Sequence, residues 1–297
     1  MVTIENDYYK VVVNPFGSEL WSIVEKASGR EYLWQAQDAD IWRRRAPILF
    51  PVCGLLKNNT AFIDGKEYHM PLHGFARDYE HKVVDLQKDS VTLRFSDSSE
   101  TKKMYPFSFV LYVKYYLTEK ILHCQYVVEN HSHVSMPFSI GYHTGYRCPL
   151  ADDSDAHDCV LMFEKAETLH SLVMEDGLFT GDTKPLLHEE RSLDLFDPCF
   201  PGSCIVEGFH SRYIELYDKK AGKGLRVGIA GFPQLVFWIN HESRPFVCIE
   251  PWYGIPDTTN TDGDFRRKKE ILTLNAEGTF TCEQTIEINS HKEMLSQ

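Results

Sequence analysis

The chain has 297 residues, of which 43% are hydrophobic, 25% charged and 13% aromatic, and its formal net charge is −12. This balance is typical of a globular protein with a sizeable core, long enough for two ordinary domains or one large domain. The negative charge argues against nucleic acid or an anionic membrane as partner, because both need basic patches. We therefore expect a small or neutral partner.

The N-terminal segment, residues 1–13 (MVTIENDYYKVVV), has no basic stretch followed by an apolar one. No apolar run in the chain approaches the length of a bilayer span, so a cytoplasmic location is expected. The eight cysteines are scattered without a C-x-x-C pair. This pattern favours reduced thiols in a core over a disulfide framework.

Short segments with β-branched, aromatic or alternating residues recur along the chain, and turn residues such as Asp64-Gly65 separate them. Residues 107–116 (FSFVLYVKYY) show the two-residue period of a half-buried strand most clearly. The expected strands are 9–13, 90–95, 107–116, 122–128, 213–217, 225–229, 234–239, 246–250, 271–274 and 279–288. Many short strands with regular turns predict an all-β antiparallel sandwich or barrel.

No internal repeat or low-complexity linker divides the chain. Residues 151–201 are richer in Asp, Glu, His and Pro than the rest, and we interpret them as a long excursion over the sandwich. The segments on both sides of this stretch have the same β character. We therefore predict one domain over residues 1–297.

A metal site is one interpretation of His131 and His133, whose spacing places both side chains on one face of a strand. His123, His143 and Glu129 are near in sequence, and a β-barrel metal site can use such groups. The alternative is a polar turn between two strands. The chain lacks C-x-x-C, H-E-x-x-H and acidic calcium-loop motifs, so no metal is predicted.

Two other kinds of site are not supported by motifs. Residues 221–224 (AGKG) lack the spacing of nucleotide-binding loops and are interpreted as a hairpin turn. The G-x-S-x-G motif of many serine hydrolases is also absent from the sequence.

A carboxylate, Glu250, follows the apolar run 246–249 and directly precedes Pro251. Proline cannot donate a ladder hydrogen bond, so we expect the strand to end there. Aromatic residues follow, and a carboxylate among them loses hydration, which raises its pKa toward the value that a general base needs. The alternative is a carboxylate at the rim that pairs with an arginine such as Arg244.

Two histidines are candidate partners for this carboxylate. His143 lies in residues 138–146 (FSIGYHTGY), where alternation places it on one face with Ser139 and Gly141. These small residues would leave space for a ligand, but a core histidine is the alternative. His73, between Leu72 and Gly74, is either a satisfied turn histidine or part of a proton-transfer site.

Four stretches together resemble the aldose 1-epimerase (galactose mutarotase) family, in particular its smaller bacterial branch linked to lactose utilisation. They are residues 42–51 (WRRRAPILFP), 73–78 (HGFARD), 141–143 (GYH) and 248–254 (CIEPWYG). The resemblance covers nearly the whole chain. It implies a large antiparallel β-supersandwich with few short helices, a cleft across one sheet, and a mechanism without metal or organic cofactor.

The resemblance also implies roles for individual residues. Glu250 would take the proton of the C1 hydroxyl of a pyranose, and His143 would protonate the ring oxygen, so that the ring opens and recloses as the other anomer. His73 would steady the charge that develops there. The expected substrate contacts are Arg44, Arg77, Trp238, Trp252 and Asp197. The imidazole is expected to start protonated and Glu250 to start ionised, because their attraction favours that state.

The sequence departs from the family pattern at two places. Residues 143–146 read HTGY where relatives commonly have H-P-x-F, which changes the turn beside the second histidine. The sugar-binding acid usually found in mid-chain is replaced by residues 201–203 (PGS), with Asp197 as a substitute. We therefore expect a substrate that differs from galactose or glucose, or a lower activity.

Three further functions remain as alternatives. A hexose 6-phosphate 1-epimerase would need cations at the cleft mouth, for which Arg43, Arg45 and Arg77 are available. A sugar-binding or sensing sandwich would keep the cleft without turnover. A cupin-like metal enzyme would use His131 and His133. The expected assembly is a monomer or a homodimer.

Overall fold

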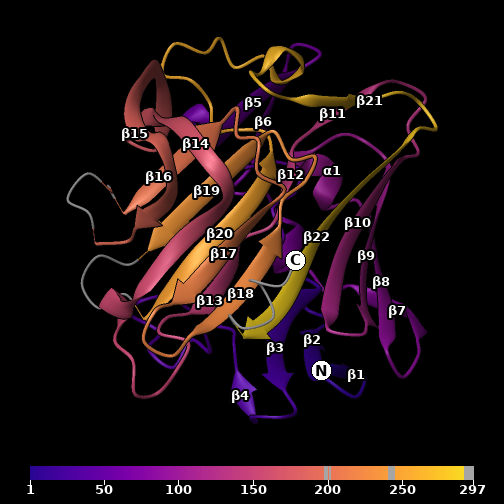
Figure 1. Ribbon diagram of the computed structural model, residues 1–297. Coiled ribbons are helices and arrows are strands. Elements are labelled where there is room, and N and C mark those ends of the chain that lie inside the picture. The colour runs from indigo at the N-terminus through magenta and orange to yellow at the C-terminus, as the bar shows by residue number, and fades with distance from the viewer. Residues whose placement is uncertain (197–199, 201, 240–244, 291–297) are drawn as a thin grey trace.

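The computed structural model describes residues 1–196, 200, 202–239 and 245–290, and most of these lie in β-strands (Figure 1). In these ranges, helical structure is limited to short turns. They are α1 (Thr101–Met104) and the 3-10 turns η1 (Lys57–Asn59), η2 (Ala76–Asp78), η3 (Ala156–Asp158) and η4 (Phe265–Arg267). This confirms the predicted all-β class with few short helices. None of the helices described is long and apolar enough to cross a bilayer.

The largest sheet contains fourteen antiparallel strands in the part of the chain that is described. Its order is β12 (Ile140–Gly141), β20 (Phe246–Tyr253), β19 (Gln234–Ile239), β16 (Ser203–Glu207), β14 (Cys159–Glu175), β17 (Tyr213–Asp218), β18 (Lys223–Gly228), β22 (Thr279–Ser290), β10 (Ile121–Asn130), β9 (Phe109–Thr118), β8 (Ser90–Ser96) and β7 (Lys82–Leu86). Two further strands pair beside this path, β13 (Thr144–Arg147) with β20 and β15 (Leu178–Asp194) with β14.

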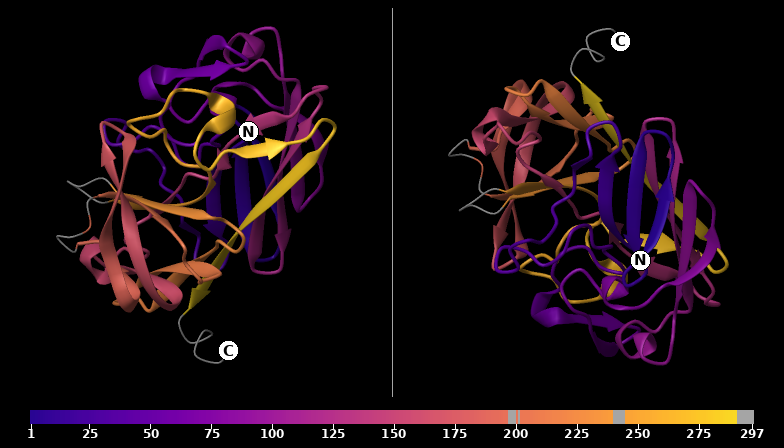
Figure 2. Two further views of the ribbon diagram at one scale, coloured as in Figure 1. Left: turned by 90° about the horizontal axis from the view of Figure 1, so that it is seen from above. Right: turned by 90° about the horizontal axis from the view of Figure 1, so that it is seen from below.

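The large sheet bends into two arms, and the N-terminal sheet packs against the arm that contains β8, β9 and β10 (Figure 2). The N-terminal sheet consists of β1 (Val2–Glu5), β2 (Tyr9–Asn14), β3 (Glu19–Glu25) and β4 (Arg30–Glu31). Two small two-stranded sheets complete the fold. One is the hairpin of β5 (Thr60–Ile63) and β6 (Lys66–His69), and the other pairs β11 (Met136–Phe138) with β21 (Leu272–Leu274), which is distant in sequence. The Tyr115 hydroxyl on β9 donates to the Ser18 carbonyl at 2.8 Å and ties the two layers together. The result is the large antiparallel β-supersandwich that the sequence resemblance implied.

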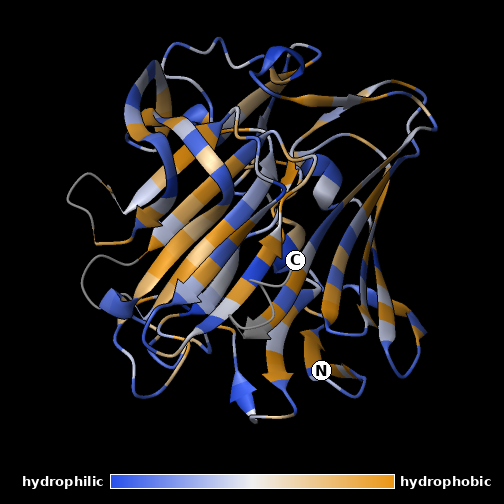
Figure 3. Ribbon diagram, viewed as in Figure 1, coloured by the Kyte–Doolittle hydropathy of each residue, from blue (hydrophilic) through white to orange (hydrophobic). Residues whose placement is uncertain are grey.

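Alternating apolar residues explain the two-layer packing. On β9 the side chains of Phe109, Leu111, Val113 and Tyr115 are buried, as the two-residue period predicts. The strand begins at Phe109, two residues later than expected. Figure 3 shows the same alternation of hydrophobic and hydrophilic positions along neighbouring strands.

The expectation that Pro251 ends its strand is wrong, because β20 continues to Tyr253. The Pro251 carbonyl accepts a hydrogen bond from the backbone N–H of Tyr142. In an antiparallel pair the N–H and the carbonyl of one residue point to the same neighbouring strand, so the N–H that proline lacks would also have faced Tyr142. There the Tyr142 carbonyl accepts the indole N–H of Trp252 instead, at 3.0 Å. A side chain therefore replaces the lost ladder bond, and the strand carries on through the proline.

The interpretation of residues 151–201 as an excursion outside the sheet is also wrong. Most of this stretch forms β14 and β15, two strands of 17 residues each that pair with one another. The first part of β14 pairs with β17, and its later part reaches β16 at Ser171. The exposed, polar residues of β15 hide the strand pattern in the sequence. This hairpin forms one wall of the cavity described next.

Candidate active site

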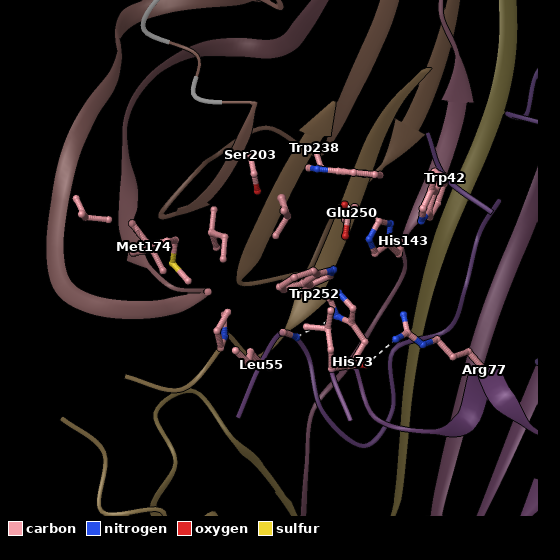
Figure 4. Close-up of a pocket in the computed structure, with 18 of the residues that line it drawn as sticks. Trp42, Leu55, His73, Arg77, His143, Met174, Ser203, Trp238, Glu250 and Trp252 are labelled. Carbon is pink, nitrogen blue, oxygen red and sulfur yellow. Dashed lines mark hydrogen bonds and ion pairs between the residues drawn. The ribbon is translucent and has the colours of Figure 1, made fainter. Parts of the chain in front are cut away.

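A cavity of about 800 Å³ opens over one face of β16, β19 and β20 (Figure 4). Alternate residues of the three strands form its floor, as the strand pleat requires. These floor residues are Ser203, Ile205, Val236, Trp238, Glu250 and Trp252. The β14–β15 hairpin and the loops around residues 41–42, 54–55 and 72–77 form its walls.

Glu250 and His143 lie side by side in this cavity. The Glu250 Oε1 atom is 3.3 Å from the His143 Nδ1 atom, and the two side chains are 1% and 11% exposed. Glu250 is held by the centre of β20, whereas His143 falls in the break between β12 and β13. The Glu250 Oε2 and His143 Nδ1 atoms are both buried and have no hydrogen-bond partner among the described residues, so the 3.3 Å approach of the pair is a close contact and not a hydrogen bond. Arg244, its alternative partner from sequence, lies outside the described residues.

Burial controls the protonation of this pair. It raises the pKa of Glu250 well above the usual value of a carboxyl. It also lowers the pKa of His143 to about 3, with a smaller contribution from the positive charge of Arg77. Both shifts favour a neutral pair, in which the one shared proton sits on Glu250. The expected starting state, with the proton on His143 and Glu250 ionised, is therefore corrected. The loss of hydration destabilises two buried charges by more than their mutual attraction stabilises them.

His73 lies next to the pair, and its ring meets those of His143 and Trp252 edge-on, with centroids 5.4 and 5.6 Å away. The backbone N–H of Gly54 donates to His73 Nδ1 at 3.1 Å. Nδ1 is therefore an acceptor, and the ring proton must be on Nε2. Burial lowers the pKa of His73 well below its usual value, so this histidine is a neutral hydrogen-bond donor.

The turn interpretation of His73 is confirmed, and its role in proton transfer stays a prediction. It occupies a turn in the left-handed region, with φ +64°, a conformation that few residues other than glycine adopt. Its backbone N–H donates to the Gly54 carbonyl at 2.9 Å, so the turn is well satisfied. The turn nevertheless places the ring at the cavity. Strained backbone of this kind is concentrated at functional sites.

Three indole rings line the cavity, and the sequence predicted two of them, Trp238 and Trp252. The third, Trp42, stacks on His143, with ring centroids 5.1 Å apart and 25° between the planes. It also meets Trp238 edge-on at 5.4 Å. Trp42 opens the WRRRAP stretch, but it was not predicted as a site residue, because no local sequence pattern brings it next to His143.

The small residues beside His143 do not leave room for a ligand, contrary to expectation. A Cβ atom on Gly141 would come within 2.5 Å of the Trp252 ring, so that space is already filled. Ser139 packs in the same way, because a Cβ atom on Gly254 would lie 2.3 Å from its Oγ atom. Small residues at these positions therefore make room for other parts of the protein, such as the Trp252 ring, and not for a ligand.

Of the predicted arginine contacts, Arg77 lines the cavity. Its guanidinium is oriented by a 2.6 Å hydrogen bond from Nη2 to the Leu72 carbonyl. Arg44 is not among the residues that line the cavity; it forms an ion pair with Asp78 and donates to the Arg77 carbonyl at 3.3 Å. Asp197, the remaining predicted contact, lies outside the described residues.

Of the three cations expected for a phosphate-bearing substrate, only Arg77 is among the residues that line the cavity. Arg43 donates to the Ala39 carbonyl at 3.3 Å, and Arg45 stacks on Trp21 with its guanidinium carbon 3.6 Å from the ring centroid. Neither lines the cavity. Lys184 on β15 does so, and nothing in the sequence distinguished it from other surface lysines.

The turn interpretation of His131 and His133 is confirmed, because both are exposed in the connection between β10 and β11. His131 pairs there with Glu129 at 2.9 Å. A different group could hold a metal ion among the described residues: single ligand atoms of His143, Cys248 and Glu250 lie within 4.8 Å of one another. Burial raises the pKa of the Cys248 thiol, however, which disfavours the thiolate form that binds metals.

Comparisons with known proteins identify the family of this chain. The sequence profile of the family described as aldose 1-epimerase matches residues 1–273. The plasmid and chromosomal forms of protein LacX from Lactococcus lactis subsp. lactis are each 34% identical over 282 residues, which is 92% of this chain and 93% of theirs. The chain therefore belongs to the aldose 1-epimerase family. Membership supports an isomerase that acts on sugars.

Solved structures show the same fold. A galactose mutarotase related enzyme from Lactobacillus acidophilus is 30% identical with a TM-score of 0.92, and the match covers 98% of this chain and 97% of the other. A galactose mutarotase-like protein from Lactobacillus casei is 32% identical with a TM-score of 0.91, covering 97% and 100%. A galactose mutarotase-like protein from Clostridium acetobutylicum, 18% identical with a TM-score of 0.80 and covering 97% and 94%, shares the fold.

Proposed function

We propose that this protein is an aldose 1-epimerase that interconverts the α and β anomers of a hexose or related aldose. The observation that carries the proposal is the buried Glu250–His143 pair, 3.3 Å apart in a cavity of about 800 Å³. A positioned general acid or base contributes roughly 10²–10⁴-fold to a rate. One carboxyl and one imidazole are therefore sufficient for a reaction that moves only protons and one C–O bond.

In the proposed reaction, the pair uses one proton. The proton passes from Glu250 to His143 across the short gap between Oε1 and Nδ1. The carboxylate then takes the C1 hydroxyl proton as the C1–O5 bond breaks and a C1 carbonyl forms, and the imidazolium gives its proton to O5. After rotation about C1–C2, the roles reverse, the ring closes on the other face of the carbonyl, and the pair again holds one proton.

Neighbouring groups assist without transferring protons. The neutral His73 presents its Nε2–H to the ring oxygen or an adjacent hydroxyl, where charge develops. Arg77 orients hydroxyl groups, and the indoles of Trp42, Trp238 and Trp252 offer flat apolar surface to the sugar. We propose that no metal or organic cofactor takes part, since no step is a redox or group-transfer reaction.

We also propose that the protein acts in the cytoplasm. The seven cysteines in the described part of the chain are all unpaired and buried, in keeping with a reducing compartment. Cys199 lies outside the described residues.

The test is direct measurement of anomer exchange, by saturation-transfer NMR or polarimetry, over a panel of aldoses. Glu250→Gln and His143→Asn should each abolish enzymatic exchange while sugar binding is largely kept. A matched control is the pair Glu129 and His131, also a carboxylate beside an imidazole, at 2.9 Å, with side chains 33% and 54% exposed. Glu129→Gln and His131→Asn should exchange sugars at the wild-type rate. Full activity in both cavity variants would show that the acid–base assignment is wrong.

The same measurements separate the alternatives. Sugar binding without exchange by the wild-type protein would identify a sensing or binding protein. A hexose 6-phosphate 1-epimerase has one observation in its favour: Arg77 and Lys184 both line the cavity. In that case inorganic phosphate should compete with substrate, and Arg77→Ala should weaken binding of the phosphorylated sugar more than binding of the free sugar.

A further inference from the structure

We infer that the preferred substrate is an aldose with an apolar substituent on the ring edge remote from C1. This inference rests on the proposed function, because it takes C1 and the ring oxygen to lie at Glu250 and His143. It comes from a contrast within the cavity: the half that contains the acid–base pair is polar and aromatic, and the other half is aliphatic.

The strand register defines where the aliphatic half begins. Val236 on β19 is the direct cross-strand partner of Glu250 on β20, and Ile205 on β16 is the direct partner of Val236. Directly opposed residues of antiparallel strands present their side chains on the same face. Neighbouring strands are about 4.8 Å apart, and β16 is two strands away from β20. Along this row the floor is therefore aliphatic to roughly 10 Å from the strand that holds Glu250.

Aliphatic side chains also wall this half of the cavity. Leu172 and Met174 come from the β14–β15 hairpin, and Leu55 comes from the loop after the first sheet. Leu172, Ile205 and Val236 belong to one hydrophobic cluster and are 3–4% exposed, with Met174 packed against it. Figure 4 shows Met174 and Leu55 on the side of the cavity away from His143 and Arg77.

Few polar groups serve this half. Among the described residues that line the cavity, the polar side chains apart from the acid–base pair, His73 and Arg77 are Lys184 and Ser203. Both are exposed, Ser203 at the end of the floor where β16 begins and Lys184 on the wall formed by β15. A hydroxyl that is buried without a partner loses its hydrogen bonds to water. A sugar hydroxyl on this edge would therefore bind poorly, whereas an apolar group would gain contact with the aliphatic walls.

The reaction limits where the apolar group can be. Ring opening needs a free C1 hydroxyl, so the group cannot be a glycoside on C1. C4 lies across the ring from C1, and C6 is attached to C5, the neighbour of C4. A group on O4 or O6 would therefore point away from the acid–base pair. Cavities of roughly 300–1,000 Å³ hold drug-sized ligands. At about 800 Å³ this one has room beyond a single pyranose.

The experiment compares galactose, 4-O-butylgalactose, 6-O-butylgalactose and lactose, which is a disaccharide with a free reducing end. Anomer exchange is measured by saturation-transfer NMR and binding by the fluorescence of the cavity tryptophans. Each buried methylene is worth roughly a fourfold gain in affinity. We expect at least one butyl ether to show a kcat/KM about tenfold or more above that of galactose. Both ethers at or below galactose, or lactose above both ethers, would overturn the inference.

Two near-isosteric variants and a control test the location. Val236→Thr and Met174→Gln add polarity to the aliphatic half with little change in shape, and each should lower the ratio of ether to galactose kcat/KM about threefold or more. The control is Val84→Thr on β7, an exposed position 46% accessible and outside the cavity. It should leave the ratio unchanged. An unchanged ratio in both cavity variants would contradict the assignment even if the ethers are good substrates.

The outcomes separate this inference from the proposed function. Exchange of galactose without an advantage for either ether would leave the epimerase proposal standing and overturn the substrate class. Tighter binding of an ether than of galactose, with no exchange of any sugar, would support the apolar substituent and reject the epimerase proposal. Neither exchange nor preferential ether binding would reject both.

Discussion

The indole of Trp42 lies stacked on the imidazole of His143, and a glycine makes this contact possible. A Cβ atom on Gly145 would come within 2.7 Å of Cζ3 of the Trp42 ring. Gly145 is part of the HTGY stretch, one of the two departures from the family pattern. In this chain the turn thus accommodates an aromatic ring that stacks on His143, the histidine proposed as the proton donor.

The first prediction follows from that contact. Gly145→Ala should displace the Trp42 ring and lower kcat roughly 10–100-fold, since misplacement by about 1 Å can have such an effect. The double variant Gly145→Ala/Trp42→Phe should recover part of the loss, because a shorter ring removes the clash. Anomer exchange at saturating sugar measures kcat. Full activity in the single variant, or no recovery in the double one, would contradict a positioning role for Trp42.

The second prediction concerns pH. The pair needs one proton, and it loses that proton as pH rises through the raised pKa of Glu250. It gains a second proton only as pH falls toward about 3, the lowered pKa of His143. We therefore expect kcat/KM to fall on the acid side only near pH 3, and to fall on the alkaline side as pH rises through the raised pKa of Glu250. An acid-side fall near pH 6.5, where a free imidazole titrates, would contradict the neutral pair.

Stability offers an independent check of the same shift. The pKa of Glu250 is higher in the folded than in the unfolded protein, so its contribution to stability is complete below the unfolded value and is lost as pH rises through the folded value. Melting temperatures should therefore decline more steeply for the wild type than for Glu250→Gln as pH rises from the usual carboxyl pKa through the raised pKa of folded Glu250. Parallel curves would show that Glu250 is already ionised when folded. The variant Glu129→Gln, at an exposed carboxyl, serves as the control.

Much of the fold could be predicted from local sequence because alternation records which face of a strand is buried. Residues 234–239 were expected as a strand and are β19 to the residue. Prediction failed where a tertiary contact decides the outcome. Pro251 stays within β20 because Trp252 supplies a hydrogen bond from its side chain, which no local pattern shows.

The candidate site was predicted unevenly for a similar reason. Glu250, His143 and His73 were selected from sequence, and all three line the cavity. The arginines were harder, because Arg44 and Arg77 come from different segments and only the fold decides which one reaches the cavity. Arg77 does so, and Arg44 pairs with Asp78 instead. The aliphatic half was not predicted, since its residues come from strands that are distant in sequence.

The third prediction concerns His73, whose Nε2–H is proposed to contact the substrate. His73→Asn should keep the fold, since asparagine tolerates the left-handed conformation. It should lower kcat/KM roughly 10²–10³-fold, the usual effect of removing one hydrogen-bond donor from a transition state. His73→Ala should also cost about 1–3 kcal/mol of stability in urea unfolding, because the buried Gly54 N–H loses its acceptor.

A second buried histidine provides the control for His73. His81 contacts Ser18 Oγ at 2.6 Å and the Ala76 carbonyl at 2.9 Å, and it does not line the cavity. His81→Asn should lower stability while leaving kcat/KM near the wild-type value. A loss of activity at His81 as large as that at His73 would mean that the effect of His73 is structural.

The fourth prediction concerns a buried ion pair behind the cavity. Lys268 Nζ lies 3.0 Å from Asp257 Oδ1, with side chains 2% and 4% exposed, and it also donates to the Ile255 carbonyl at 2.6 Å. The pair holds the loop that contains Pro256, which packs so closely on Gly54 that a Cβ atom there would approach to 2.4 Å. Gly54 in turn orients the His73 ring. The ion pair is therefore expected to position the wall of the site.

Lys268→Met should destabilise the protein by about 3–5 kcal/mol, because it leaves an unpaired buried carboxylate. The double variant Lys268→Met/Asp257→Asn should be more stable than the single one, since the uncompensated charge is gone. Urea unfolding measures both effects, and KM for the sugar should rise in parallel with the disorder of the loop. Lys103→Met, which breaks an exposed pair with Glu100, is the matched control and should change little. A single variant as stable as this control would show that the Lys268–Asp257 pair does not hold the loop.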